Sequence, residues 1–356
     1  MTSSKSMTQK MQLTQVSSKL QNLSVTKSNT ATAASSYALT DLGTLGGHLC
    51  VAKDINDSTQ IVGYSITSSG QRRAFVWSPN KGMEYIDTLG DTSNCAYSIN
   101  DYGQIVGYFV SDSGQRKAFI WDETKGFQNI NTESDDFSEA YGINNFGQVV
   151  GSAISGDCHR KAFVWDSKNG MEYINSSSEI ESIAYSINNF GEVAGYSLSS
   201  DFILKAFVWK INKGIQELPG FLGSDINISG QVVGFYAVPE DNNRAFLWDG
   251  SNKFQDLSTI SGNVNLQFFD SEANSINNSG LIVGHSDRIM DEEQELWGKK
   301  AFIWDSVNKM QDLNDLIYPA NDWILREAQA INNHGQIVGW GNKGQSRHAF
   351  LLTPIS

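Results

Sequence analysis

The sequence predicts an all-β fold of seven similar units, and two recurring markers predict it. The first marker is an Ile-Asn pair followed by a run resembling Gly-Gln-Val-Val-Gly, and the second is Ala-Phe-x-Trp. The Ile-Asn pairs begin at Ile55, Ile99, Ile143, Ile187, Ile226, Ile276 and Ile331, and the second marker begins at Ala74, Ala118, Ala162, Ala206, Ala245, Ala301 and Ala349. A repeat of this length with short strands is typical of propeller blades. We therefore expect a seven-bladed β-propeller.

The third unit illustrates why each unit should hold four antiparallel strands. An apolar stretch ends at Ile143, and the turn Asn144-Asn145-Phe146-Gly147 follows it. Asn can hydrogen-bond its own backbone in such a turn, and Gly can take a positive φ. Three further short apolar segments, 148–152, 161–166 and 171–175, are separated by loops that are too short for helices.

The third strand of the unit is expected to pack on both of its faces. Phe163 and Trp165 point to one side and Ala162 and Val164 to the other, since side chains alternate along a strand. This pattern fits a sheet between two neighbouring sheets. The recurrent Trp is accordingly assigned to the core rather than to a sugar-binding surface.

The two ends of the chain indicate how the ring would close. The last unit stops at Leu351-Leu352-Thr353-Pro354 after three strands, while Leu39-Thr40-Asp41-Leu42 matches the fourth-strand pattern of 310–313. We expect the N-terminal strand to complete the last blade, which would hide the edges of an open array. Residues 1–36 are expected to form a disordered tail and 37–356 a single propeller domain.

The repeats resemble a bacterial family of probable extracellular repeats named for the tripeptide His-Ala-Phe. The tripeptide is literal at His348-Ala349-Phe350, and Asp41 to Gly47 and Ile331 to Gly339 are similar to the linker and turn of that family. The resemblance implies no catalytic set. One departure is Thr59, which stands where the other copies have Gly and allows a different first turn.

Composition excludes several classes of function. The chain has 356 residues and a net charge of −13, which disfavours nucleic acid as a partner because Lys and Arg supply most of that affinity. No apolar run is long enough to cross a membrane. Residues 1–36 lack the apolar core of a signal peptide, so we expect a cytoplasmic protein or export by a specialised secretion system. The cysteines Cys50, Cys95 and Cys158 are expected to be free thiols, and no metal or cofactor is expected.

Three additions interrupt the repeat in the last three units, at 261–272, 287–298 and 314–327. By strand order all three leave from one rim, here called the top rim, which carries the loops between second and third strands. Loops that break a repeat on one face often bind partners. The candidate contact residues are Phe268, Phe269, Asp270, Arg288, Glu292, Glu293, Glu295, Trp297, Tyr318, Asp322, Trp323 and Arg326. Alternatively, Phe268, Trp297 and Trp323 cover the apolar surface of the ring itself.

A second candidate site is a ring of cations at the start of each third strand. Its members are Arg73, Lys117, Lys161, Lys205, Arg244, Lys300 and His348. A polyanion or an acidic partner could use such a ring. Alternatively, the cations lie over neighbouring aromatic rings or pair with acids such as Asp136 or Glu181.

The leading functional hypothesis is a monomeric, non-enzymatic propeller that binds a protein through the top loops of blades 5 to 7. A second hypothesis is a propeller that binds glycans or small ligands in near-equivalent grooves between blades. A third is a hydrolase or lyase that uses top carboxylates such as Asp270, Glu292 and Asp322. The sequence lacks a nucleophile elbow, a phosphate loop and a paired-histidine metal motif. The turns at Asn56-Asp57, Asn100-Asp101 and Asn144-Asn145 supply too few carboxylates for a calcium loop, so we expect them to be simple turns.

Overall fold

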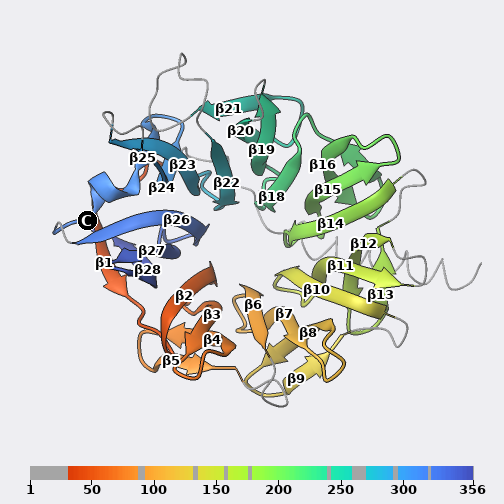
Figure 1. Ribbon diagram of the computed structural model, residues 1–356. Coiled ribbons are helices and arrows are strands. Elements are labelled where there is room, and N and C mark those ends of the chain that lie inside the picture. Colours follow the sequence, from red (N-terminus) through yellow and green to blue (C-terminus); the bar gives the residue numbers. More distant parts are fainter. Residues whose placement is uncertain are drawn as a thin grey trace, which may run out of the picture.

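The protein is an all-β molecule, described by a computed structural model over residues 31–86, 93–130, 135–155, 159–174, 179–238, 242–258, 270–291, 296–319 and 322–355. Its strands form five four-stranded antiparallel sheets and one eight-stranded sheet. Figure 1 shows these sheets arranged around a common centre, with the first strand of each unit nearest to it. The expected all-β fold of four-stranded antiparallel sheets is confirmed.

The strands follow the order of the sequence repeats. The first three units comprise β2 (Gly46–Ile55), β3 (Ile61–Thr67), β4 (Arg72–Ser78), β5 (Gly82–Tyr85), β6 (Asn94–Ile99), β7 (Ile105–Val110), β8 (Arg116–Asp122), β9 (Gly126–Asn129), β10 (Asp135–Ile143), β11 (Val149–Ser155), β12 (Arg160–Asp166) and β13 (Gly170–Tyr173). The next two comprise β14 (Glu179–Ile187), β15 (Val193–Ser199), β16 (Leu204–Lys210), β17 (Gly214–Glu217), β18 (Leu222–Ile226), β19 (Val232–Val238), β20 (Asn242–Trp248) and β21 (Phe254–Ser258). The last two comprise β22 (Ser271–Ile276), β23 (Ile282–Asp291), β24 (Leu296–Asp305), β25 (Lys309–Asp312), the short 3-10 helix η1 (Leu313–Leu316), β26 (Trp323–Ile331), β27 (Ile337–Lys343) and β28 (Ser346–Pro354).

The core lies between the sheets, as the two-faced third strand predicts. Phe163 packs in one cluster with Val106 and Ile120 of the preceding unit, and Trp165 packs against the same cluster. Ala162, on the opposite face of β12, belongs to a second cluster with Phe207 of the following unit. Each sheet is therefore sandwiched between its neighbours, and the burial of Ala and Phe of the second marker sets the spacing of the sheets.

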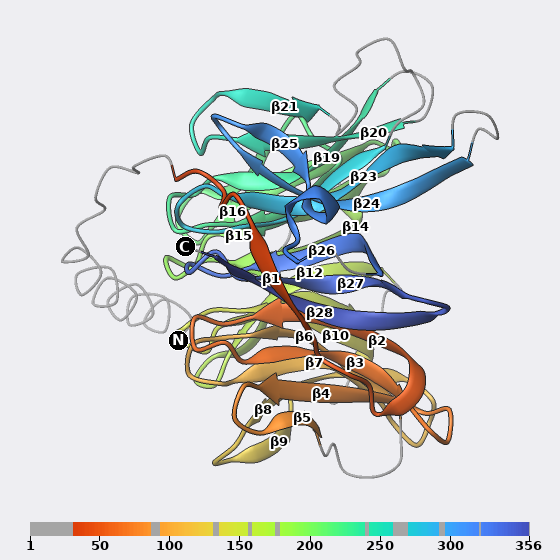
Figure 2. The same cartoon turned by 90° about the vertical axis from the view of Figure 1, so that its left-hand side faces the viewer.

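The two ends of the chain lie side by side. Strand β1 (Tyr37–Asp41) pairs antiparallel with β28, from Tyr37 opposite Pro354 to Asp41 opposite Phe350. Figure 2 shows β1 running along this last sheet. Strand β28 also meets β2 through one parallel pair, Leu49 with Arg347, which joins two four-stranded sets into the eight-stranded sheet. Just before β1, the Ala33 N–H donates to the Asp305 carboxylate at 2.9 Å.

The turns after the Ile-Asn pairs are linked to one another. In the second unit, Asn100 Oδ1 accepts the N–H groups of Tyr102 and Gln104 at 3.1 and 3.0 Å, and Asn100 Nδ2 donates to the Asn144 carbonyl at 3.0 Å. The same donation from one turn to the next runs through Asn56, Asn100, Asn144, Asn188, Asn227, Asn277 and Asn332. Asn332 donates to the carbonyl of Asn56, so the cycle returns to its start.

The departure at Thr59 leaves the first turn unchanged. Thr59 adopts a φ of 60°, within the left-handed region that Gly103 occupies in the next unit. Its N–H donates to the Asn56 carbonyl at 3.1 Å, as the Gly103 N–H does to Asn100 at 3.0 Å. The hydrogen bonds of the turn therefore hold a non-glycine residue in this conformation.

Candidate functional site

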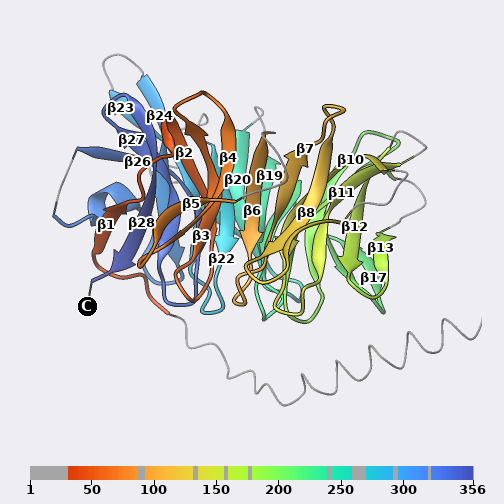
Figure 3. The same ribbon diagram turned by 90° about the horizontal axis from the view of Figure 1, so that it is seen from below.

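The structure describes the predicted top-rim residues only in part. Phe268, Phe269, Glu292, Glu293 and Glu295 lie outside the described residues, and Arg288 and Trp297 are described by backbone alone, in β23 and β24. The addition at 287–298 continues a hairpin instead of forming a loop, because β23 and β24 stay paired from Ile282 opposite Trp304 to Asp291 opposite Leu296. Figure 3 shows this hairpin reaching beyond the rim of the other sheets.

The remaining top-rim candidates have different surroundings. Tyr318 is 69% exposed, whereas Trp323 is 8% exposed and packs at 5.9 Å, edge to face, on the His348 ring. Trp323 is therefore a core residue, which agrees with the alternative that it covers the surface of the ring. Asp270 accepts the Asn243 N–H at 2.6 Å. Arg326 donates to the Lys299 carbonyl at 3.3 Å, and Asp322 is exposed just before β26.

Part of the predicted cation ring is engaged by its own molecule. Lys205 pairs with Glu217 at 3.1 Å, and His348 Nδ1 lies 3.0 Å from Asp41. Burial alone would raise the pKa of Asp41, but its hydrogen bonds from Gly43, His348 and Lys343 lower that pKa overall. Four arginines one position earlier lie over aromatic rings: Arg72 over Tyr64, Arg116 over Tyr108, Arg160 over Phe137 and Arg347 over Trp340. These contacts favour the structural alternative for these cations.

A buried carboxylate network lies near the centre of the ring, and sequence reasoning missed it. Glu139, 3% exposed, binds Arg116 at 2.6 Å and Arg160 at 3.0 Å, and it also accepts the Tyr141 hydroxyl. Tyr97 and Tyr185 flank Tyr141 with ring centroids 5.1 and 5.2 Å away. The signal was the Tyr two residues before Ile-Asn in three successive units. All charges in this network are paired, so it holds adjacent sheets together.

The central channel contains a small polar hollow of about 150 Å³. Asp54 faces it and accepts hydrogen bonds from Ser98 Oγ at 2.7 Å and the Ile99 N–H at 2.9 Å. Desolvation raises the pKa of Asp54 to about 7, against the lowering effect of these hydrogen bonds. Asp225 makes matching contacts to Ser186 and Ser275. Both aspartates join first strands of neighbouring units and have a structural role.

His285, on β23, is the histidine most removed from solvent. Its exposed fraction is 1%, and its Nδ1 lies 4.0 Å from the Glu327 carboxylate. Desolvation lowers the pKa of His285, although Glu327 acts in the opposite direction. The side chain is therefore neutral at pH 7 and belongs to the packing between β23 and β26.

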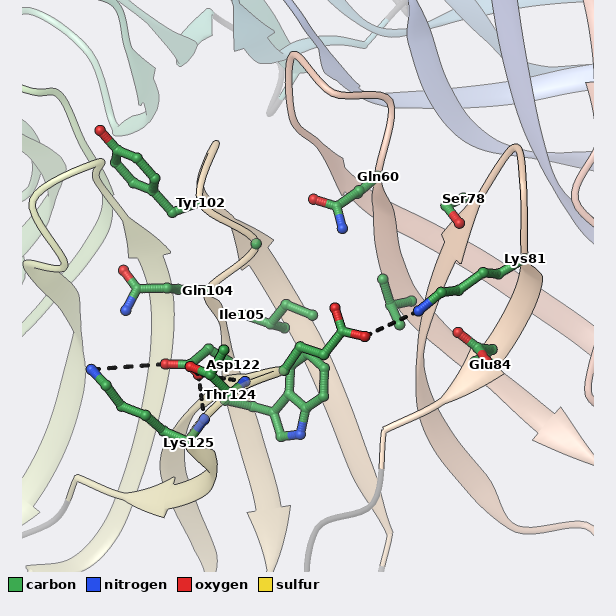
Figure 4. Close-up of a pocket in the computed structure, with 14 residues that line it drawn as sticks. Gln60, Ser78, Lys81, Glu84, Tyr102, Gln104, Ile105, Asp122, Thr124 and Lys125 are labelled. Carbon is green, nitrogen blue, oxygen red and sulfur yellow. Dashed lines mark hydrogen bonds and ion pairs between the residues drawn. The ribbon is translucent and has the colours of Figure 1, made fainter.

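A groove lies on the bottom rim, the rim that carries the Ile-Asn turns. It has a volume of about 570 Å³ and lies between the β2–β5 strands and the β6–β9 sheet. Figure 4 shows Gln60 and Tyr102 at its upper edge, Lys81 on one wall and Asp122 on the other. Trp121 lines it while also packing against the core between the two sheets.

Two ion pairs lie along this groove. Lys81 reaches across it to Glu123 at 3.1 Å, and Lys125 lies 4.0 Å from Asp122. Hydrogen bonds from Thr124 and Lys125 outweigh desolvation and hold the pKa of Asp122 below its usual value. The lining also includes the exposed Glu84, so the groove holds two lysines and three carboxylates.

A second groove repeats the first in the next unit. It has a volume of about 190 Å³ and is lined by Gln104, Lys125, Phe146 and Trp165, among others. Gln104, Lys125, Phe146 and Trp165 stand 44 residues after Gln60, Lys81, Tyr102 and Trp121 of the first groove. The repeat thus places the same amide, cation and pair of aromatic groups in both grooves.

Over the described ranges, no helix is both long and apolar enough to cross a membrane. Within the same part of the chain, no three His, Cys, Asp or Glu side chains gather in a way that could hold a metal ion. Cys50 and Cys95 are free and buried, and desolvation raises the pKa of each thiol to about 12. Cys158 lies outside the described residues.

Comparison with known proteins gives a fold and no function. Residues 198–341, under half of the chain, match a family described as a protein of unknown function, DUF3466. No curated protein matches the chain in sequence.

Solved structures similar to the chain share little sequence with it. A puromycin-hydrolysing peptidase from Mycobacterium tuberculosis has a TM-score of 0.58 and 8% identity, covering 91% of this chain and 55% of its own. The β-propeller domain of the Trilobed protease from Pyrococcus furiosus has a TM-score of 0.51 and 8% identity, and the match covers 89% of this chain and 95% of that domain. TolB from Acinetobacter baumannii has a TM-score of 0.48 and 11% identity, covering 71% of this chain and 63% of its own. The chain therefore spans 63% of TolB and about half of the peptidase, and its fold is of the β-propeller type.

Proposed function

We propose that the chain is a seven-bladed propeller, closed by β1, that serves as a binding module. The cycle of asparagine hydrogen bonds from Asn56 to Asn332 and back supports a count of seven. The pairing of β1 with β28 supports closure of the last blade by the N-terminal strand. We also propose that the repeats are of the His-Ala-Phe type, because Ala and Phe of that tripeptide are the residues buried between sheets in each unit.

The binding sites in this proposal are the two grooves of the bottom rim, and their ligand is a small polar molecule such as a glycan. The observation that carries the proposal is that one groove of about 570 Å³ is repeated 44 residues later with equivalent groups. Ligand pockets of a few hundred Å³ typically combine aromatic surface with a few polar groups. Here Trp121 and Tyr102 supply the aromatic surface, and Gln60 supplies an amide.

A glycan array tests this proposal with fluorescently labelled protein. The Tyr102→Ala, Phe146→Ala variant removes two side chains that are 75% and 53% exposed, so we expect its folding to be unchanged. We expect glycan signals from the wild type that fall at least about tenfold in this variant, equivalent to about 1.4 kcal/mol. Phe202→Ala is the matched control, since Phe202 is 79% exposed in a loop on the opposite rim. A blank array with wild-type protein at high concentration would exclude the grooves as glycan sites.

A second candidate function is protein binding through the top rim of blades 5 to 7. The observation that favours it is the β23–β24 hairpin, whose strands are ten residues each against seven in the corresponding β11 and β12. Beyond Ser286 the hairpin pairs with no other strand within the described part of the chain, so it presents two strand edges. The exposed Tyr318 and Asp322 lie in the next connection of the same rim.

Pull-down from extracts of the source organism tests the second candidate. Replacing 288–298 with Asn-Gly would shorten the hairpin and close it with a two-residue turn. We expect a partner captured by the wild type, and by the groove variant, to be lost with the shortened hairpin. Equal capture by all three proteins would count against this surface.

A further inference from the structure

On the bottom rim, one turn position, here called the controlling position, faces the glutamine of the preceding unit at several junctions between units. In the second unit this position is Gly103: a Cβ there would lie 3.5 Å from Gln60 Oε1 of the preceding unit. Gly147 and Gly191 stand in the same relation to Gln104 and Gln148, also at 3.5 Å. A side chain at this position would therefore reach the amide of the preceding unit.

The junction between the last and first units shows what such a side chain does. Thr59 occupies the controlling position there, and its Oγ1 donates to Gln336 Oε1 at 2.9 Å. Gln336 Oε1 also accepts from Asn332 Nδ2 at 2.7 Å. The Thr59 hydroxyl thus reaches the glutamine of the last unit and adds a side chain at the inner end of this junction, where Gly103 and Gly147 have none.

The fourth unit changes the chemistry of its junctions in another way. Glu192 stands where the earlier units have Gln, and Lys210 binds it at 2.5 Å. Lys210 stands 88 residues after Asp122, at the equivalent position of the fourth unit, and Ile211, 48% exposed, takes the place of Glu123. The fourth unit therefore has its amide replaced by a paired carboxylate, and it has an apolar side chain where the first two grooves have Glu123 and Ser167.

The first two grooves offer an uncharged ligand a fixed set of hydrogen bonds. Gln60 Oε1 accepts from Asn56 Nδ2 at 2.8 Å, and Gln104 Oε1 accepts from Asn100 Nδ2 at 2.8 Å. Each contact fixes the amide and leaves its Nε2 donors for the groove, at whose edge Figure 4 shows Gln60. Both lysines nearby are paired with carboxylates, and Glu84 adds a negative charge to the first groove. A ligand with its own charge would have to break these pairs, whereas vicinal hydroxyl groups can donate and accept between them.

We infer that the ligand is an uncharged sugar and that the chain binds two sugar units, one in each of these grooves, with access controlled by Gly103 and Gly147. This inference rests on the proposed function of the grooves. It adds the ligand class, the number of sites and the residue that closes a site. Trp121 and Trp165 would contact the apolar face of the sugar ring, and Gln60 and Gln104 its hydroxyl groups.

Equilibrium dialysis with radiolabelled methyl glycosides of glucose, galactose, mannose, fucose and N-acetylglucosamine tests the inference. We expect two equivalents bound by the wild type, one by Gly103→Thr and none by Gly103→Thr, Gly147→Thr. Gly191→Thr is the matched control: it places the same side chain at the same positive φ in the third junction, and we expect it to bind two equivalents. Glucosamine and glucuronic acid are expected to bind at least about tenfold more weakly than the uncharged glycoside.

The outcomes separate this inference from the function on which it rests. Two equivalents retained by Gly103→Thr, a loss caused by Gly191→Thr, or a preference for a charged sugar would overturn the inference while leaving the grooves as binding sites. Absence of binding by every glycoside, together with a blank glycan array, would overturn both. The thermal midpoints of the three glycine variants show whether each is folded.

Discussion

At the scale of the residue, the asparagine of the Ile-Asn pair shows why one side chain type recurs in every unit. Asn144 Oδ1 accepts the Phe146 and Gln148 N–H groups, each at 3.0 Å. Its Nδ2 donates to Gln148 Oε1 at 2.8 Å and to the Asn188 carbonyl at 3.1 Å. Only an amide combines an acceptor for two N–H groups with two donors. Aspartate could hold the turn but could not donate to the next unit.

Substitution of this asparagine should therefore separate the turn from the link between units. We expect Asn144→Ala to lower the free energy of unfolding by about 2 to 4 kcal/mol, since each hydrogen bond contributes about 1 kcal/mol. Asn144→Asp keeps the two accepted bonds, and we expect a smaller loss for it at pH 5 than for alanine. Urea denaturation measures both. Equal losses of unfolding free energy in the two variants would mean that the two hydrogen bonds accepted by Asn144 Oδ1 contribute nothing to stability.

Asp54 should give the protein a measurable dependence on pH. Its folded-state pKa of about 7 lies above the usual 3.8, so the folded protein holds this proton more tightly than the unfolded chain does. The resulting stabilisation is complete below about pH 4 and is lost as the pH rises towards 7. Relative to Asp54→Asn, we expect the wild type to lose roughly 3 to 4 kcal/mol between pH 4 and pH 7.5. A constant difference between the two proteins over this range would contradict the assignment.

At the scale of the element, the repeat predicted most of the strands but not their irregularities. The starts of β11 to β13 lie within one residue of the expected segments, because they adjoin turns and loops with Asn, Asp and Gly, whose chemistry is local. Strand β11 ends three residues later than expected, and β13 ends two residues earlier. The long β23–β24 hairpin was expected as a loop, since 287–298 is an addition that interrupts the repeat. The shift of register between Ala140 and Gly142 also has no local signal, yet it accompanies the placement of Tyr141 beside Glu139.

Removal of β1 should cost far more stability than removal of the residues before it. We expect a chain lacking 1–30 to keep its thermal midpoint within about 2 °C, because no contact of β1 is lost. A chain lacking 1–46 loses the whole pairing of β1 with β28, including the fully buried Tyr37. We expect its midpoint to fall by 10 °C or more, or soluble expression to fail, with about 3 kcal/mol as the smallest loss. Differential scanning fluorimetry makes the comparison, and equal midpoints would refute closure by β1.

At the scale of the whole molecule, the sequence predicted a set of blades better than it predicted what lies between them. Gln60 and Tyr102 belong to different units, and only the packing of one sheet on the next turns them into a groove. Their roles in the sequence are those of turn residues, so nothing local marks them as a site. The top-rim additions were visible because they break a pattern. The grooves keep the pattern, and repetition hides them from a search for irregularity.

The overall charge leads to a prediction about salt. A net charge of −13 repels anionic ligands over the whole surface, and this repulsion weakens as salt screens it. An uncharged sugar feels no such field, so we expect its dissociation constant to change less than about twofold between 50 mM and 500 mM sodium chloride. The glycoside selected by dialysis serves as the probe. A change of tenfold or more would indicate a charged ligand and would argue against the sugar class.

The cycle of asparagine amides and carbonyls has a consequence for how such a gene can change. Each asparagine of an Ile-Asn pair donates to the carbonyl of the next one along the chain, and Asn332 donates to the carbonyl of Asn56 as well as to Gln336 of its own turn. Gaining or losing one copy would preserve each local turn yet alter the angle between all neighbours at once. Copy number is thus inherited as a single property of the circle, and individual copies are free to diverge only in the residues that face outward.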